Sequence, residues 1–184
     1  MLKTGDEAAV SIRAVAEAVG VTPPSIYMHF ADKDALLVAV CAEHFAKLDE
    51  VSEAAVLGVK DPMERIERRG RAYIQFGLDN PEPYRIMFMT RTASGLQMSD
   101  EELAQMSSFH HLREDVEAAM AVGRMPKGDS FAMGCGLWAV VHGITSLLIS
   151  KPNFPWPPLE EFIGAAIGAA AAKAHRRKRP GSHG

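Results

Sequence analysis

The sequence predicts an all-α protein of about nine helices, in which a small N-terminal head precedes a C-terminal helical bundle. No segment alternates β-branched and polar residues in the manner of a half-buried strand. Apolar residues recur instead at spacings of three and four, and Pro or Gly marks the breaks between such segments. The segments before residue 33 are short and rich in turn residues, whereas those after it are long enough to build a bundle.

The head is expected to hold two short helices joined by a tight turn. The first covers residues 11–19, and Gly20 ends it because glycine adopts the left-handed conformation without strain. The second covers residues 23–30, with Thr22 as its N-cap and proline in its first turn, where a missing N–H costs nothing. This arrangement is that of a helix-turn-helix, whose second helix enters the major groove of DNA. Its expected small core consists of Val15, Val19, Val21 and Ile26.

Longer helices are expected after the head. The first covers residues 33–57 with Asp32 as its N-cap, and the others cover residues 61–78, 84–89, 99–122, 129–150 and 159–177. The segment 129–150 is apolar on every face, so we expect it to be buried on most sides. These elements divide the chain into a head of residues 1–46, a bundle domain of residues 47–178 and a tail of residues 179–184.

Composition and motifs argue against several classes of protein. The 184 residues, 47% hydrophobic and 23% charged, have the balance of a globular chain rather than a disordered one. No apolar run approaches the ~20 residues that span a bilayer, and the first residues lack the apolar core of a secretory signal. We therefore expect no membrane partner. Cys41 and Cys135 form neither a disulfide framework nor a zinc cluster, so we expect a reducing, cytoplasmic setting. No phosphate-binding glycine loop, nucleophile elbow or zinc-protease histidine pair occurs in the sequence, so we expect neither enzyme activity nor a cofactor.

The segment 11–37 resembles the DNA-binding domain of TetR-family transcriptional repressors. The residues that match at the family spacing are Ala16, Gly20, Val21, Ile26, Tyr27, His29, Phe30, Lys33, Leu36 and Leu37. The bundle resembles the C-terminal domain of one TetR branch, whose signature corresponds to Trp138, His142 and Gly143. The resemblance implies a homodimeric, ligand-responsive repressor that binds a palindromic double-stranded DNA operator and is released by a small hydrophobic effector. It also implies a helix before residue 5, of which only residues 1–4 remain, so that the sequence starts late or is a fragment.

The resemblance further implies a set of DNA-contacting residues. Arg13 is expected to reach a base edge, because arginine is the commonest reader of guanine. Met28 is expected to touch a thymine methyl group, whereas Tyr27, His29 and Lys33 are expected to contact phosphates. The beginning of the second helix, which meets the bases, comprises Thr22, Pro23, Pro24 and Ser25.

A hydrophobic effector cavity is implied within the methionine-rich bundle. Its expected lining is Tyr84, Met87, Phe88, Met106, Phe109, His110, Trp138 and His142. The alternative is a plainly packed core, in which His142 makes hydrogen bonds with its neighbours. A metal site built from His110, His111, Glu114 and Asp115 is not expected, because adjacent histidines point about 100° apart on a helix.

The Gly and Ala residues of the last helix predict a surface through which two copies of the chain associate. Gly and Ala fill residues 164–172 apart from Ile167, so a partner helix can approach this segment closely. Together with residues 129–150 it is expected to form a two-fold four-helix bundle, which makes residues 47–178 a ligand-binding and dimerisation domain. The alternative function is a helical small-molecule carrier or scaffold without DNA binding. It is favoured by the missing first helix and by an acidic head, in which residues 1–34 hold three basic and five acidic side chains.

Overall fold

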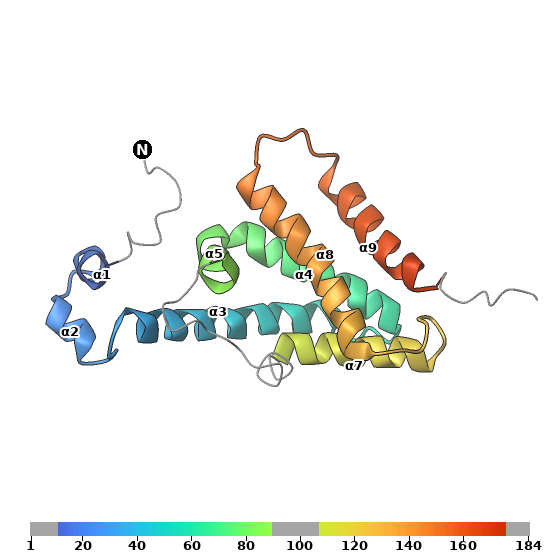
Figure 1. Ribbon diagram of the computed structural model, residues 1–184, viewed down its shortest axis with the longest axis horizontal. Coiled ribbons are helices and arrows are strands. Elements are labelled where there is room, and N and C mark those ends of the chain that lie inside the picture. Colours follow the sequence, from blue (N-terminus) through green and yellow to red (C-terminus); the bar gives the residue numbers. More distant parts are fainter. Residues whose placement is uncertain (1–10, 90–106, 176–184) are drawn as a thin grey trace, which may run out of the picture. The chain divides into compact units, whose positions relative to one another are not determined.

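The computed structural model describes residues 11–89 and 107–175, with the surroundings of side chains described up to residue 168. These residues form helices and no strand, which confirms the all-α prediction (Figure 1). The chain divides into two compact units. The head unit contains residues 11–46 and 82–89, and the bundle unit contains residues 47–81 and 107–175. One helix, α3 (Lys33–Val56), contributes to both units.

The head unit begins with the predicted helix-turn-helix. Helix α1 (Ile12–Val19) starts at Ser11, whose side chain accepts a hydrogen bond from the Ala14 N–H at 3.1 Å. It ends at Gly20, whose φ of 73° lies in the left-handed region that favours glycine. Helix α2 (Pro23–Tyr27) follows with Thr22 at its N-cap. The helix is shorter than predicted, because the amides of His29 and Phe30 both bond to the Ile26 carbonyl and close a turn before α3.

The core of the helix-turn-helix differs from the prediction. Its buried residues are Ile12, Ala16 and Ile26, with Val15, Phe30 and Leu36 packed around them. Val19 and Val21, expected in this core, are 64% and 43% exposed. Helix α2 has only five residues, so it covers the middle of α1 and leaves the valines beside the turn uncovered.

Two further helices complete the head unit. Helix α3 is capped by Asp32, whose side chain accepts a hydrogen bond from the Ala35 N–H at 2.8 Å, as predicted. Helix α5 (Pro81–Met89) begins three residues earlier than predicted, because a proline in the first turn of a helix loses no hydrogen bond. Aromatic rings join the two helices, since the Phe88 ring of α5 lies 5.5 Å from the Phe45 ring of α3. Within α5, the Phe88 ring also lies 4.8 Å from that of Tyr84.

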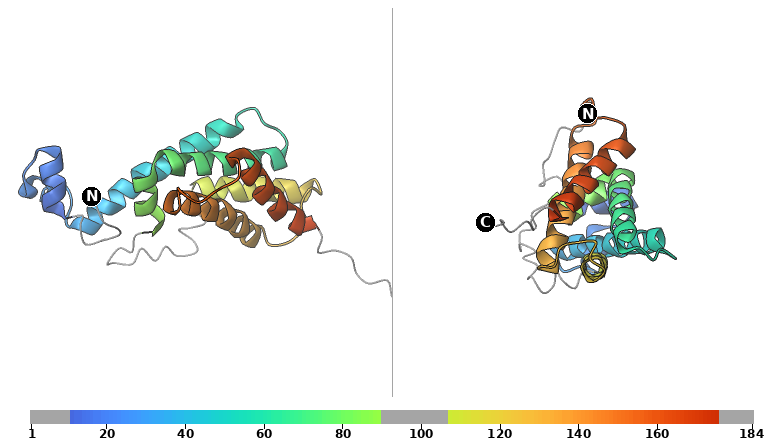
Figure 2. Two further views of the ribbon diagram at one scale, coloured as in Figure 1. Left: turned by 90° about the horizontal axis from the view of Figure 1, so that it is seen from above. Right: turned by 90° about the vertical axis from the view of Figure 1, so that its right-hand side faces the viewer.

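The bundle unit is built on α4 (Pro62–Asp79), α7 (Ser107–Ala121), α8 (Ser130–Ser150) and α9 (Leu159–His175). Helix α4 packs against the other three, and α8 also packs against α7 and α9 (Figures 1 and 2). Aspartates at the N-caps, Asp61 and Asp129, each accept two backbone N–H bonds and set the starts of α4 and α8. One core cluster centres on Ile66 and Val116, and a second joins Ile74 of α4 to Ile144 and Ile163.

Helix α8 is less buried than its composition predicts. Among the described residues, α8 is long and apolar enough to cross a membrane, contrary to the expectation that no apolar run approaches that length. Only 28% of its most apolar window is buried. This length and composition also suit a helix of a packed bundle, and α8 contacts α4, α7 and α9. One face, with Leu137, Val141 and Ile144, is buried, whereas the opposite face is open. The expectation of burial on most sides was wrong, because apolarity around a helix does not distinguish a core face from a face that another chain covers.

Candidate functional site

The predicted DNA-contacting residues cluster on one part of the head unit. Six of the nine are exposed, namely Arg13, Thr22, Pro24, Tyr27, Met28 and His29, and three are half-buried, namely Pro23, Ser25 and Lys33. Arg13 of α1 and Tyr27 of α2 line the same hollow, about 450 Å³ in volume, together with Pro23 and Glu17. The structure thus places the predicted base reader beside the predicted recognition helix.

Two large side chains at the recognition helix are exposed. Met28 is 83% exposed and Tyr27 is 55% exposed, although both occupy a unit with very little core. Large apolar side chains left uncovered beside polar groups are typical of a binding surface. Phe30 behaves differently, since it packs against the small core, as expected for an aromatic residue with no polar group.

The electrostatics of this surface are mixed. Among residues 11–34, Arg13 and Lys33 are basic, whereas Glu17, Asp32 and Asp34 are acidic. Glu17 lies in the same hollow as Arg13, and Asp32 is used as the N-cap of α3. The head therefore presents specific cationic groups rather than a broad basic patch.

The predicted effector-cavity residues divide between the two units. Tyr84, Met87 and Phe88 belong to α5 of the head unit, where Tyr84 is fully buried. In the bundle unit, the Trp138 ring lies 6.3 Å from that of Phe109 and 5.8 Å from that of His142. Met106 lies outside the described residues.

His110 does not join this aromatic group. Its side chain is 53% exposed, and its Nε2 lies 3.4 Å from the Glu114 carboxylate one helical turn away. Phe109 next to it is buried and faces Phe131 and Trp138, because consecutive residues of a helix point about 100° apart.

A chain of hydrogen bonds surrounds His142. The Trp138 indole N–H donates to the Tyr73 hydroxyl at 3.2 Å, and this hydroxyl lies 3.2 Å from His142 Nδ1. The Ser146 hydroxyl lies 3.4 Å from the other ring nitrogen, Nε2. Burial lowers the pKa of His142, so the imidazole is neutral at physiological pH. His142 therefore makes the hydrogen bonds with its neighbours that the alternative of a plainly packed core predicts.

A cleft in the bundle unit was not anticipated from the sequence. It encloses about 320 Å³, and its lining includes the apolar side chains of Ile66, Met125, Leu137 and Ile167. Its polar side is formed by Asp61, Glu64, Glu67 and Arg124. These residues come from α4, α8, α9 and the segment after α7, so no local motif signals them.

A buried ionic network links α4 to α7 and α3 in the bundle unit. Asp115, 4% exposed, accepts hydrogen bonds from Arg65 at 2.5 Å and from Arg69 at 2.6 Å. Arg69 also binds Glu53 at 2.6 Å. Burial opposes the charge of Arg69, but the hydrogen bonds that Arg69 donates to Asp115 and Glu53 prevail and raise the pKa of its guanidinium. Asp115 is therefore committed to the two arginines.

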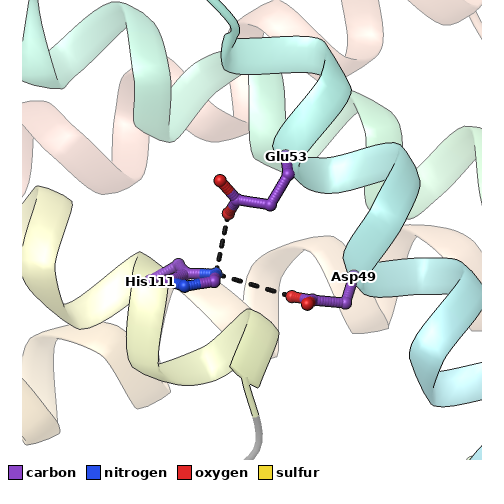
Figure 3. Close-up of side chains that lie close together, drawn as sticks. All are labelled: Asp49, Glu53 and His111. Atoms are coloured by element: carbon purple, nitrogen blue, oxygen red, sulfur yellow. Dashed lines mark ion pairs between the residues drawn. The ribbon is translucent and has the colours of Figure 1, made fainter.

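His111 instead faces two carboxylates of α3, as Figure 3 shows. Its Nδ1 lies 2.7 Å from the Glu53 carboxylate and 3.5 Å from that of Asp49. The Ser107 hydroxyl donates to the other oxygen of Asp49. This grouping was not predicted from the sequence, because its members come from two helices and His111 has acidic neighbours on its own helix as well. The available signal was the spacing of four between Asp49 and Glu53, which places both on one face of α3.

The fold and the head define a helix-turn-helix protein with an attached helical bundle. Residues 66–174 match the family of tetracyclin repressor-like C-terminal domains, and residues 5–40 match the bacterial regulatory proteins of the tetR family. The first match alone covers more than half of the chain. The chain therefore belongs to the TetR family of DNA-binding transcription regulators, which confirms the resemblance. The assignment of Trp138, His142 and Gly143 to a branch signature stays a prediction.

Solved structures have the same fold. A protein with unknown function from Rhodococcus sp. RHA1 is 25% identical, with a TM-score of 0.73 over 91% of this chain and 86% of that chain. A TetR family transcription regulator from Marinobacter aquaeolei VT8 is 20% identical, with a TM-score of 0.71 over 89% and 84% of the two chains. The TetR family transcriptional regulator PfmR from Thermus thermophilus is 19% identical, with a TM-score of 0.65 over 94% and 91%. A comparison with curated proteins finds no match.

Proposed function

We propose that the protein is a homodimeric repressor that binds a palindromic DNA operator and releases it when a small hydrophobic molecule binds the bundle. The observation that carries this proposal is the exposed recognition helix of a head that matches the family. Two such heads would bind half-sites about one helical turn, ~34 Å, apart. Membership of a regulator family also favours a role without enzyme activity.

Two kinds of DNA contact are proposed for the head. Arg13, exposed and beside α2, reads a base, whereas Tyr27 and Lys33 hold phosphate oxygens. Met28, with 83% of its surface exposed, supplies an apolar contact to a thymine methyl group. The remaining proposed contacts are Thr22, Pro23, Pro24, Ser25 and His29.

The DNA contacts are tested by selecting bound DNA from a random pool and then measuring operator variants. Arg13→Ala should relax preference at one base pair by ~1–3 kcal/mol. Tyr27→Phe and Lys33→Ala should weaken binding to all sequences alike and, for Lys33, reduce its salt dependence. A uniform loss of affinity with Arg13→Ala would contradict the base-reading role. A full-length chain that selects no sequence at all would favour the carrier function instead.

Dimerisation is proposed through the open faces of α8 and α9. On α8 this face consists of the exposed residues Ala132, Gly136, Ala139 and Leu147 and the half-buried Gly143. A Cβ atom added at Gly136 or Gly143 would meet nothing within 4 Å, so each leaves room for a partner helix. On the neighbouring α9, Ala165 and Gly168 are likewise exposed. Gly164 is less suited, because its added Cβ would lie 3.8 Å from the Arg71 side chain.

The proposed interface is tested by replacing its glycines with a larger residue. Gly136→Leu and Gly143→Leu, singly and together, should yield monomers or aggregates, because the added side chains hold the partner helix away. Ala118→Leu, at an exposed site on α7, is the matched control and should leave the mass unchanged. Light scattering after size-exclusion chromatography reports the mass. A double glycine variant that remains a dimer would exclude this interface.

The effector is proposed to be a largely apolar molecule held near Phe109, Trp138 and His142. The aromatic rings supply apolar surface, and the polar group of His142 orients a ligand. Molecules that raise the melting temperature should also release the operator, since a regulator's ligand must bind its two states unequally. Trp138→Leu should abolish both effects while operator binding without the ligand persists. Ligands that stabilise the protein without changing its affinity for DNA would indicate a carrier.

A further inference from the structure

The side chains of Asp49, Glu53 and His111 bring three metal-binding atoms together in the bundle unit (Figure 3). Their ligand atoms all lie within 4.8 Å of one another. Two carboxylates come from consecutive turns of α3, and the imidazole comes from α7, which lies far along the chain. Such a group, assembled from separate helices, is distinct from the predicted effector cavity and from the DNA-contacting surface.

The two separations that involve His111 are close to those between ligands of a single ion. Two ligands ~2.0–2.2 Å from one Zn²⁺, at angles between right-angled and tetrahedral, lie about 2.8–3.6 Å apart. His111 Nδ1 lies 2.7 Å from the Glu53 carboxylate and 3.5 Å from Asp49 Oδ1, close to the two ends of that range. The third pair, Asp49 and Glu53, lies within 4.8 Å, so the carboxylates would move closer together around a bound cation.

Buried atoms in the group are not satisfied by hydrogen bonds. Both Asp49 Oδ1 and His111 Nδ1 are shielded from solvent and form no hydrogen bond, in spite of their short contacts. A neutral imidazole that turns its lone pair toward two carboxylates is repelled by them. A cation between the three atoms would convert this repulsion into three favourable bonds.

The net charge of the groups around the site favours a bound cation. The contacts join three carboxylates, those of Asp49, Glu53 and Asp115, to two guanidinium groups, those of Arg65 and Arg69. One negative charge is therefore uncompensated when His111 is neutral. Arg69 is also held by Asp115, and its bond to Glu53 uses Oε1, the oxygen that lies 2.7 Å from His111 Nδ1. The ion would share this oxygen with Arg69, because a carboxylate oxygen has more than one lone pair.

The site also has an orienting residue. The Ser107 hydroxyl donates a hydrogen bond to Asp49 Oδ2 and leaves Oδ1, the oxygen nearer to His111, available as a ligand. Partners that orient ligands in this way are a regular part of protein metal sites.

We propose that Asp49, Glu53 and His111 form a binding site for a divalent transition-metal ion of the Zn²⁺ class, which fastens α3 to α7. One imidazole and two carboxylates form a nitrogen and oxygen ligand set that suits this class. Sequence analysis expected no metal, because it considered only the histidines and acids of α7. Helix α3 also carries Lys33 of the DNA-contact set, so the ion would act on the helix that leads from the head, a consequence that rests on the proposed function.

Calorimetric titration of the full-length chain with Zn²⁺ tests the site without any DNA. His111→Gln and Asp49→Asn should each lower the Zn²⁺ affinity at least ~10-fold, because each removes a ligand. Ser107→Ala should lower it by about 10-fold, through loss of the orienting bond. His110→Gln is the matched control, since His110 lies next to His111 but pairs with Glu114 on the exposed side, and it should bind as the unaltered chain does. Glu53 is left intact because it also holds the buried Arg69.

Thermal unfolding provides a second readout. Zn²⁺ should raise the melting temperature of the unaltered chain and of His110→Gln, but not of His111→Gln. If His111→Gln does not fold, judged by circular dichroism, Asp49→Asn carries the test, since only one carboxylate oxygen is altered. Equal affinities of the unaltered chain and His111→Gln, or an equal loss with His110→Gln, would overturn the proposal. Either result would mean that His111 is not a specific ligand of the ion.

Discussion

The helix-turn-helix of the head and the bundle unit differ in how far apart in sequence their stabilising contacts lie. The helix-turn-helix core joins Ile12, Ala16 and Ile26, which are neighbours along the chain. In the bundle, Arg69 and Asp115 bond across 46 positions, and Ile74 packs against Ile163. Caps and residue spacing report local contacts directly, whereas a pairing between distant helices leaves little local trace. This difference explains why the head was recognised from its sequence and the ionic network was not.

The two units also differ in what they bury. Of the described residues, the buried polar and charged side chains, which are Ser52, Arg69, Asp115 and Thr145, all belong to the bundle unit. The head buries apolar and aromatic side chains, and its charged side chains among residues 11–34 stay at least partly accessible. Its buried residues are Ile12, Ala16, Ile26, Leu37, Cys41 and Tyr84. The bundle therefore depends on electrostatic pairing as well as on apolar packing, and the head depends on packing and caps.

Removing Asp115 should have the largest effect on the bundle. Asp115→Ala leaves the buried Arg69 with only the Glu53 carboxylate, and breaking a buried pair costs ~3–5 kcal/mol in the free energy of unfolding. Chemical denaturation measures the loss. Glu114→Ala is the control, because its carboxylate is exposed and pairs only with His110, and it should cost under ~1 kcal/mol. Similar losses of unfolding free energy in the two variants would show that the buried network stabilises the bundle no more than an exposed ion pair does.

Shortening Ile26 should damage the head and spare the bundle. Ile26→Ala removes one of three buried residues of the helix-turn-helix core, at a cost near the lower end of ~2–5 kcal/mol because this core is small. Operator binding should therefore be lost, while most of the helical signal and its unfolding transition remain. Val19→Ala is the control, since Val19 is 64% exposed, and it should change little. Loss of both units together in Ile26→Ala would mean that they unfold as one.

Acidification should weaken the bundle through His142, with the smallest of the three effects. Burial lowers the pKa of His142 in the folded chain, so below its ordinary value of 6.5 the unfolded chain binds a proton that the folded chain resists. The contribution to stability is complete above that value and is lost as the pH falls below it. Melting temperatures between pH 7 and pH 5 should decline less steeply in His142→Gln. Parallel pH profiles of the two chains would contradict this role.

The sequence by itself determined the helical class, the helix-turn-helix and its caps. Gly20 and Asp32 act within a few residues of their own positions, as the sequence predicts. Thr22 occupies the predicted N-cap position of α2, but its side chain makes no capping hydrogen bond. The same local spacing misplaced Val19 and Val21, because it does not report how far a short second helix reaches. The local spacing of residues also does not show which face of α8 packs against other helices of the same chain.

Only the tertiary structure decided which distant side chains meet. The sequence shows pairs at a spacing of four in three helices, Asp49 with Glu53, Arg65 with Arg69, and His111 with Asp115. Packing of α3, α4 and α7 matches Asp115 to the arginines and leaves His111 to the carboxylates of α3. The physical reason is that a helix fixes which residues share a face, whereas the faces that come together depend on how whole helices pack.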